Sequence, residues 1–465
     1  MSISSFLRKK FSKSLFFPSH NRGKALPEKI IELLKEDPGV WDLPELPELG
    51  SPLSSYGLIK KSQDYFAEIF SMDSCWFGVN GASGLIQSAI LSMARSGEYI
   101  LMPRNIHISV IKICLVANII PVLFDLEFSD ITGQYLPISE KWLKKILDNY
   151  LLKNIKINGI VLVNPHYQGY SSEIKSLVDL CHQASIPVLV DEAHGSYFLL
   201  CEDFGLPKSA VRAKADLVVH SLHKSLNGLT QTAMLWHCGN IIDREKIERG
   251  INLLQTTSPN SLLMASCEES LKDWLEKDNL HKYKKRIVEA RSIFKELTSM
   301  GLPLVKTDDP LKIILNTGIY GIDGFSADKF FYERGVIAEL PEMMTLTFCL
   351  GFVQQKDFVE IFENLWKELL ININRKNKLK PIKPPFQLVQ IPEITPRESL
   401  ERNSQRVTLF KSIGKISADI ICPYPPGIPL VIPGERIDKE RVDWLVNQGL
   451  MGENLLNFYI NVLDP

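Results

Sequence analysis

The sequence predicts an α/β protein whose large domain contains a doubly wound, mostly parallel β-sheet. One observation is that short apolar runs, rich in Val, Ile and Leu, alternate with helical patterns beyond residue 57. Another is that an aspartate and a lysine each follow such a run, as expected where strands end at one crevice. The chain of 465 residues, 45% hydrophobic, is also long enough for a large core and for more than one domain.

The elements follow from these patterns in chain order. Residues 1–50 are rich in Pro, Lys and Glu, and we expect an arm with one short helix over 27–35, started by its proline. The next patterns predict a helix over 59–70, a helix over 85–94, strands over 99–102, 119–124 and 159–163, a helix over 172–183, and strands over 188–191 and 217–220. A long charged helix over 281–300 precedes strand patterns over 312–315 and 345–350.

Changes in composition divide the chain into five segments. The stretch over 372–385 is basic and proline-rich, which marks a linker. The long charged helix leads from a large unit into a smaller one. We therefore expect an N-terminal arm (1–50), a large domain that carries the site (51–280), a small α/β domain (281–371), the linker (372–385) and a C-terminal domain (386–465).

Composition excludes several classes of partner. The formal net charge is −1, so no global field favours nucleic acid or an anionic membrane. No apolar run approaches the ~20 residues that span a bilayer. The eight cysteines are dispersed without a Cys-x-x-Cys pair, which indicates reduced thiols in a cytoplasmic protein.

The N-terminus carries Arg8, Lys9, Lys10 and Lys13 among apolar residues. No uninterrupted apolar region or small-residue cleavage site follows, so we do not expect a secretory signal. Two interpretations of this basic segment remain open: an amphipathic targeting or membrane-surface helix, and an arm that packs on a partner subunit.

Asp191 and Lys224 are the candidate chemical pair. Asp191 follows the apolar run 186–190, and Lys224 follows the run 215–219 after a short polar stretch. In a doubly wound sheet both residues should lie at the carboxyl ends of strands, where ligands bind. A lysine amine and a carboxylate are what pyridoxal phosphate (PLP) requires, because the amine attaches the cofactor and the carboxylate keeps its pyridine nitrogen protonated. The pair therefore predicts a PLP site.

Two other interpretations of these motifs fail on the sequence. Asp-Glu-Ala-His at 191–194 also occurs in a helicase family, but the chain lacks the glycine-rich phosphate loop that a helicase needs, since Gly23-Lys24 is followed by alanine. His194, His220 and His223 have no cysteine or carboxylate partner at metal-ligand spacing, so we expect no metal site.

Seven segments in the same order resemble the Orn/Lys/Arg decarboxylase family of fold type I PLP-dependent enzymes, over about residues 16–440. They are Phe-Pro-Ser-His-Asn-Arg-Gly at 17–23, Asp-Leu-Pro-Glu-Leu at 42–46, Asn-Gly-Ala-Ser-Gly at 80–84, Arg-Asn-Ile-His-Ile-Ser at 104–109, Asp-Glu-Ala-His-Gly at 191–195, Ser-Leu-His-Lys-Ser-Leu at 221–226, and the proline-rich stretch 424–435. The resemblance implies a transferase-like fold type I architecture in a short form without an N-terminal wing domain. It also implies a homodimer or larger homo-oligomer, since such sites are usually built between two subunits.

The resemblance assigns roles around the cofactor. Lys224 would carry PLP, Asp191 would bind the pyridine nitrogen, and His107 would stack on the ring. Ser221 and His223 would reach the phosphate. His194 could orient Asp191 or contact the substrate, although a structural role is an equal alternative.

The phosphate would also meet the start of the predicted helix over 85–94. Ala82, Ser83 and Gly84 precede this apolar stretch, and backbone amides at a helix N-terminus bind anions. Ala82 departs from the hydroxyl residue usual in the family, so one hydrogen bond to the phosphate is missing or is supplied by Ser83 or a backbone amide.

A decarboxylase of basic amino acids needs an anion at the far end of its pocket. We expect Glu435, in the proline-rich loop, to supply it, with Glu339 at a strand edge as the alternative. His166 stands where the family has threonine in a Pro-Thr-Tyr-x-Gly turn, which leaves the substrate preference open.

The resemblance implies decarboxylation of arginine, lysine or ornithine to an amine that feeds polyamine synthesis, with Lys224 or His223 returning a proton to Cα. Two alternatives stay open. One is another fold type I activity, such as an aminotransferase or lyase. The other is a PLP-binding pseudoenzyme that regulates a decarboxylase, which the departures at Ala82 and His166 suggest. The sequence does not choose among the three amino acids.

Overall fold

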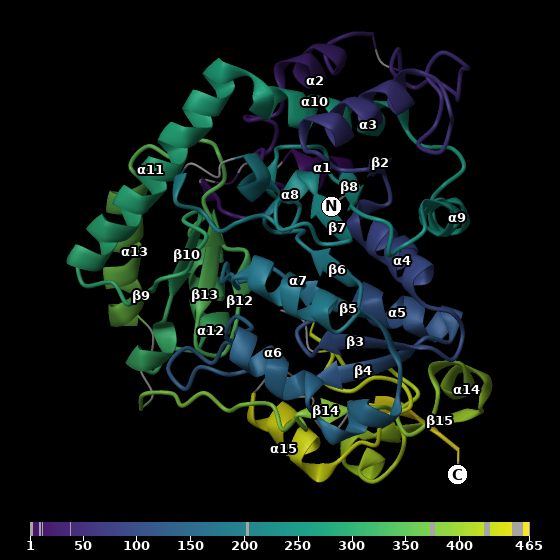
Figure 1. Cartoon of the computed structure of the whole chain (residues 1–465). Helices are drawn as coiled ribbons and strands as arrows, with labels where there is room; N and C mark the ends of the chain where they lie inside the picture. The colour runs from purple at the N-terminus through teal and green to yellow at the C-terminus, as the bar shows by residue number, and fades with distance from the viewer. Residues whose placement is uncertain are drawn as a thin grey trace.

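The computed structural model describes residues 3–8, 11, 13–37, 39–200, 204–372, 377–422, 428–448 and 459–464 (Figure 1). The N-terminal residues form the short helices α1 (Ile3–Leu7) and α2 (Glu28–Leu33). No helix among the described residues is long and apolar enough to cross a membrane.

A large, mostly parallel sheet forms the centre of the molecule and confirms the predicted fold class. In the described part of the chain it has eight strands, in the spatial order β14 (Val389–Gln390), β4 (Ile120–Phe124), β3 (Tyr99–Pro103), β5 (Ile157–Val163), β6 (Val188–Asp191), β7 (Leu217–Ser221), β8 (Ala233–His237) and β2 (Ser74–Gly78). The run from β4 to β7 is parallel, whereas β14, β8 and β2 are antiparallel to their neighbours.

Helices cover both faces of this sheet. One face packs on α4 (Gly81–Met93), α5 (Ile108–Ala117) and α9 (Arg244–Leu254), and the other on α3 (Leu58–Ile69), α6 (Glu140–Leu147), α7 (Ile174–Gln183) and α10 (Ser261–Leu275). Strand β6 shows the alternation that two covered faces require. Its Leu189 belongs to the apolar core on the side of α4, α5 and α9, whereas Val188 and Val190 belong to the core on the opposite side of the sheet.

A smaller antiparallel sheet lies beside the large one, to its left in Figure 1. Its strands are β12 (Leu340–Pro341), β13 (Leu346–Cys349), β10 (Lys312–Leu315) and β9 (Leu304–Val305). Three helices accompany it: α11 (Lys277–Ser299), α12 (Gly324–Glu333) and α13 (Phe358–Asn372). The strands expected over 312–315 and 345–350 are both present here.

The N-terminal arm docks on this small unit of its own chain. Strand β1 (Lys13–Ser14) pairs in parallel with β11 (Val336–Ile337). Beyond it, the Ser19 backbone amide donates to the His223 carbonyl at 3.0 Å. The arm therefore joins the small unit to the segment that carries Lys224.

The C-terminal segment contributes to two sheets. Strand β14 extends the large sheet beyond β4, so the first strand after the expected linker belongs to the same sheet as the site. The remaining elements are α14 (Pro396–Glu401), β15 (Ser404–Thr408), α15 (Lys439–Asn447) and β16 (Tyr459–Leu463). Strands β15 and β16 pair with each other, and the segment has its own apolar cluster. It lies below the large sheet in Figure 1.

Short 3₁₀ helices complete the description. They span Tyr150–Asn154, Ser196–Leu200, Thr317–Tyr320 and Leu409–Ser412.

Candidate active site

Asp191 and Lys224 meet at the carboxyl edge of the central strands, as the sequence predicts. Asp191 is the last residue of β6 and lies in register with Val219 of β7. Lys224 lies just beyond β7, in the single-turn helix α8 (Leu222–Ser225). Both residues line one cavity of about 430 Å³, which is within the range of small-molecule sites.

The cavity is lined by residues from most of the expected segments. They are Gly81, Ala82, Ser83, Ile86, Asn105, Ile106, His107, Ile108, Tyr135, Val163, Tyr167, Gln168, Asp191, Ala193, His194, Ser221, His223, Lys224, Cys422 and Ile428. Gly84 is the one expected phosphate-binding residue that is absent from this lining. It is buried, and the space beside it is filled by the Gln255 side chain.

The surroundings of Lys224 favour its neutral, nucleophilic amine. Burial lowers the pKa of the Lys224 ammonium, although Asp191 and Glu339 oppose this effect. Its Nζ lies 3.0 Å from His194 Nε2. Burial, together with the positive charge of Lys224, holds the pKa of His194 well below its ordinary value. His194 is therefore neutral, and its Nε2 can accept a hydrogen bond from Lys224.

The His194 ring is held between two aromatic side chains. Its centroid lies 4.4 Å from that of Tyr167 and 5.5 Å from that of Phe17. Its Nδ1 is buried without a hydrogen-bond partner among the described residues. The ring therefore has a fixed position beside the Lys224 amine.

Asp191 and His107 approach the cavity from the ends of β6 and β3, which β5 separates in the sheet. The Asp191 side chain is buried, and its Oδ1 accepts from the Ala193 backbone amide at 3.1 Å. His107 is the N-cap of α5, where its Nδ1 lies 2.8 Å from Ser109 Oγ. Burial lowers the pKa of His107 and opposes the effect of Asp191. A neutral imidazole thus lies near the carboxylate.

The remaining expected donors also line the cavity. Ala82 and Ser83 belong to the first turn of α4, whose N-cap Asn80 makes no side-chain cap bond, so amides of that turn are available to an anion. Ser221 Oγ lies 3.1 Å from His223 Nδ1. Burial lowers the pKa of His223 to about 4.

This set of side chains fits PLP. The cavity combines a buried amine, a carboxylate, a neutral imidazole and a helix N-terminus, which match the aldehyde, the pyridine nitrogen, the ring face and the phosphate of that cofactor.

Glu435, the residue expected to supply the substrate's anion, does not line this cavity. Its side chain has no exposed surface. The carboxylate accepts from both terminal nitrogens of Arg104, at 2.5 and 3.1 Å, and lies 3.5 Å from Arg441 Nη1. Burial would raise the pKa of Glu435, but the two arginines lower it. Its charge is already neutralised. Residues 423–427, which include the start of the proline-rich stretch, lie outside the described residues.

Glu339, the alternative, lies near Lys224 but is not part of the cavity lining. Its carboxylate accepts from the Phe17 backbone amide at 2.9 Å and from the Tyr167 hydroxyl. The buried ammonium of Lys312 is also close. Burial would lower the pKa of Lys312, but Cys349, Asp309 and Glu339 raise it. Glu339 therefore faces two lysines and two hydrogen-bond donors.

The turn after β5 supplies two residues that the motif reasoning missed. Tyr167 and Gln168 line the cavity, whereas His166 is buried at 1% exposure outside it. Burial lowers the pKa of His166 to about 4. The sequence signalled this turn by its position after a predicted strand, but not which of its side chains faces inward.

Comparison with known proteins supports the same assignment. The chain matches the family model described as Orn/Lys/Arg decarboxylase, major domain, over residues 9–302, and the model of its C-terminal domain over residues 381–451. It is 28% identical to an arginine decarboxylase of Bacillus subtilis, covering 92% of this chain and 89% of that one. It is 24% identical to an inducible lysine decarboxylase of Escherichia coli, covering 84% of this chain and 68% of that one.

Solved structures agree at the level of the fold. Lysine decarboxylase A from Pseudomonas aeruginosa superposes with a TM-score of 0.76 at 18% identity, covering 93% of this chain and 75% of that one. The lysine decarboxylase of Francisella novicida superposes with a TM-score of 0.73 at 19% identity, covering 90% of this chain and 73% of that one. Because both family models match in order and the fold agrees, the chain belongs to the Orn/Lys/Arg decarboxylase family and is an amino-acid decarboxylase of fold type I.

Proposed function

We propose that this chain binds PLP in the Lys224 cavity and decarboxylates a basic amino acid, which is arginine, lysine or ornithine, to the corresponding amine. The observation that carries the proposal is the buried Lys224 amine, 3.0 Å from neutral His194, in the same cavity as the Asp191 carboxylate. The names of the relatives, which include arginine and lysine decarboxylases, support the substrate class.

When bound, PLP supplies a protonated pyridine ring that accepts the electron pair left as the substrate's carboxylate departs. Asp191 would keep the pyridine nitrogen protonated, and the neutral His107 ring would pack on the cofactor without adding a positive charge. The lowered pKa of Lys224 favours the free amine that attaches the cofactor.

Of the two proton donors expected for Cα, Lys224 fits the geometry better than His223. His223, with a pKa of about 4, carries no ionisable proton to give at neutral pH, and its Nδ1 faces Ser221 Oγ and the Thr232 carbonyl. Because it contacts the Ser221 hydroxyl, His223 would instead orient Ser221 toward the phosphate. The Lys224 amine would return the proton to the substrate's Cα.

The remaining expectations belong to the same proposal. The protein would act as a cytoplasmic homodimer or larger homo-oligomer, its amine product would feed polyamine synthesis, and residues 51–280 would form the cofactor domain. Sedimentation of the holoenzyme tests the assembly.

The decisive experiment measures carbon dioxide release from each of the three amino acids by purified protein loaded with PLP. Stoichiometric amine without a keto acid supports decarboxylation over transamination. A cofactor spectrum without turnover on any of the three would instead support the pseudoenzyme alternative.

A further inference from the structure

A second, smaller cavity adjoins the Lys224 cavity at the junction of the large unit, the small unit and the C-terminal segment. Its volume is about 100 Å³, enough for several water-sized groups. Tyr135, Gln168 and Ile428 line both cavities. The two cavities therefore share a wall, and Lys224 lines only the first of them.

Glu342 places a carboxylate in this second cavity. Its Oε2 accepts from Gln134 Nε2 at 2.7 Å and from Thr345 Oγ1 at 3.0 Å, and its Oε1 accepts from Gln168 Nε2 at 2.8 Å. All three donors are uncharged. Within the described chain, no lysine, arginine or histidine forms an ion pair with Glu342.

The other buried acids nearby differ in this respect. Glu435 is paired with Arg104 and Arg441, and Asp125 is paired with Lys383 at 2.6 Å. Glu339 lies in the field of Lys224 and Lys312. A buried carboxylate that lacks a cation is costly unless it takes up a proton or a ligand supplies the cation, and burial accordingly raises the pKa of Glu342. Glu342 is the acid at this site whose balancing charge is missing from the described residues.

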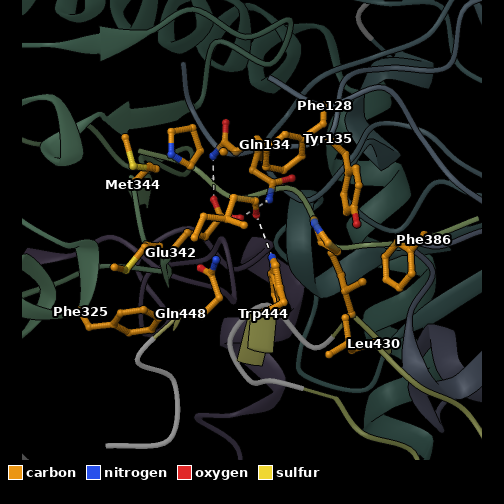
Figure 2. A pocket seen from close by; sticks show the side chains of 17 residues that line it. Phe128, Gln134, Tyr135, Phe325, Glu342, Met344, Phe386, Leu430, Trp444 and Gln448 are labelled. Atoms are coloured by element: carbon orange, nitrogen blue, oxygen red, sulfur yellow. Dashed lines mark hydrogen bonds between the residues drawn. The ribbon is translucent and has the colours of Figure 1, made fainter. Parts of the chain in front are cut away.

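The walls of the cavity suit an organic cation. Five aromatic side chains line it, those of Phe128, Tyr135, Phe325, Phe386 and Trp444. Figure 2 shows Phe325 and Met344 on one side of the cavity, Tyr135 and Phe386 on the other, and Glu342 hydrogen-bonded within it. Aromatic faces attract alkylammonium and guanidinium groups, and apolar walls accept the methylene chain that carries them.

We propose that this second cavity receives the distal cation of the substrate and that Glu342 is the residue that determines specificity for a basic side chain. The substrate's α-amino end would lie at Lys224, its chain would pass Tyr135 and Gln168, and its ammonium or guanidinium would pair with Glu342. Gln168, which lines both cavities, donates a hydrogen bond to the Glu342 carboxylate. The inference rests on the proposed decarboxylation and names the residue that selects its substrate class.

The test compares Glu342→Gln with the wild-type holoenzyme. The amide has the same shape without the charge. We expect KM for the preferred basic amino acid to rise at least tenfold, as loss of a charge-assisted hydrogen bond implies, with a smaller change in kcat. Glu360→Gln, which removes an exposed glutamate from α13, is the matched control for net charge and should leave both constants unchanged.

A second readout does not depend on turnover. Calorimetric titration with the three product amines, 1,4-diaminobutane, 1,5-diaminopentane and agmatine, should show at least tenfold weaker binding to Glu342→Gln. Norleucine, which keeps the four side-chain carbons of lysine but lacks its ammonium group, should bind both proteins equally. If amine affinity is unchanged, or if norleucine weakens in parallel, the assignment of Glu342 is overturned.

The outcomes separate the two proposals. If the wild type releases carbon dioxide from none of the basic amino acids, the proposed function fails. If the wild type is active and Glu342→Gln has the same KM, only the role of Glu342 fails. Should the glutamine variant not fold, Glu342→Asp withdraws the carboxylate by one methylene and should raise the KM for ornithine relative to that for lysine. An unchanged ratio would overturn the inference.

Discussion

Lys224 and Lys312 both lie near the site in the described chain, and the structure gives a reason to distinguish them. Lys224 has a lowered pKa and lies beside neutral His194, whereas the pKa of Lys312 is raised by Cys349, Asp309 and Glu339 despite its burial. We predict that borohydride reduction of the holoenzyme, followed by peptide mapping, will find the cofactor on Lys224. A label on Lys312 would contradict the assignment.

At Asp191 we predict that an amide will not replace the carboxylate. Asp191→Asn should lower kcat by roughly 10²-fold or more, because the amide would not keep the pyridine nitrogen protonated and an unprotonated ring accepts the electron pair less well. PLP should still bind through Lys224 and the α4 N-terminus, so the absorbance of the bound cofactor is the control. A variant with wild-type kcat would show that another group protonates the ring.

His166 carries a prediction about acid stability. Its folded pKa is about 4, below the 6.5 of an unfolded histidine, so between these values the unfolded chain binds more protons. The free energy of unfolding therefore falls as pH drops below 6.5, by about 2 kcal/mol at pH 5 for this residue. His166→Thr, which restores the residue usual in the family, should lose correspondingly less stability between pH 7 and 5. Urea denaturation of the apoprotein at both pH values tests this; equal losses would refute it.

The ion pairs of Glu435 could not be predicted from the sequence around it. The loop around it matched a family signature, and its carboxylate looked available for a substrate. Its partner Arg104 lies 331 residues away along the chain, and Arg441 belongs to a helix beyond the loop. Nothing in the local sequence reveals that two arginines converge on one glutamate, because that convergence depends on how the C-terminal segment packs against β3.

Among the elements, several strands of the large sheet that are rich in branched apolar residues were predicted, whereas β2 and β8 were not. Strand β6, Val-Leu-Val-Asp, was predicted with its observed bounds. Strands β2, Ser-Cys-Trp-Phe-Gly, and β8, Ala-Met-Leu-Trp-His, lack valine and isoleucine, and neither was predicted. They extend the sheet in antiparallel fashion beyond β7, so their pairing with neighbours far along the chain decides their structure.

The first turn of α4 allows a test at the scale of an element. Ala82 lines the cavity where the family has a hydroxyl residue. We predict that Ala82→Thr will lower the dissociation constant of PLP about two- to tenfold, because a hydroxyl at this turn can donate one more hydrogen bond to the phosphate. Ala82→Val has the same shape without the hydroxyl and should not tighten binding. Equal affinities of the two variants would show that backbone amides and Ser83 already satisfy the phosphate.

At the scale of the whole molecule, the N-terminal arm connects parts that are distant in the chain. Phe17 donates its amide to Glu339 at 2.9 Å, and Ser19 donates its amide to the His223 carbonyl at 3.0 Å and its hydroxyl to Asn227 Oδ1 at 3.0 Å. These bonds tie the small unit to α8. The two interpretations left open by the basic N-terminus did not include this docking within one chain, because the acceptors are brought to the arm by the tertiary fold.

This connection leads to a prediction with two truncations. Removing residues 1–12 leaves β1 and the later contacts intact, so PLP affinity should stay close to that of the full chain. Removing residues 1–20 deletes β1, Phe17 and Ser19, and α8 loses its hydrogen bonds to the arm. Lys224 should then be held less firmly, so we expect PLP to bind at least tenfold more weakly and the melting temperature of the holoenzyme to fall. Cofactor titration by absorbance measures the first effect and thermal unfolding the second. If the longer truncation binds PLP as tightly as the shorter one, the arm does not contribute to the cofactor site, and the position of Lys224 is set by the large unit alone.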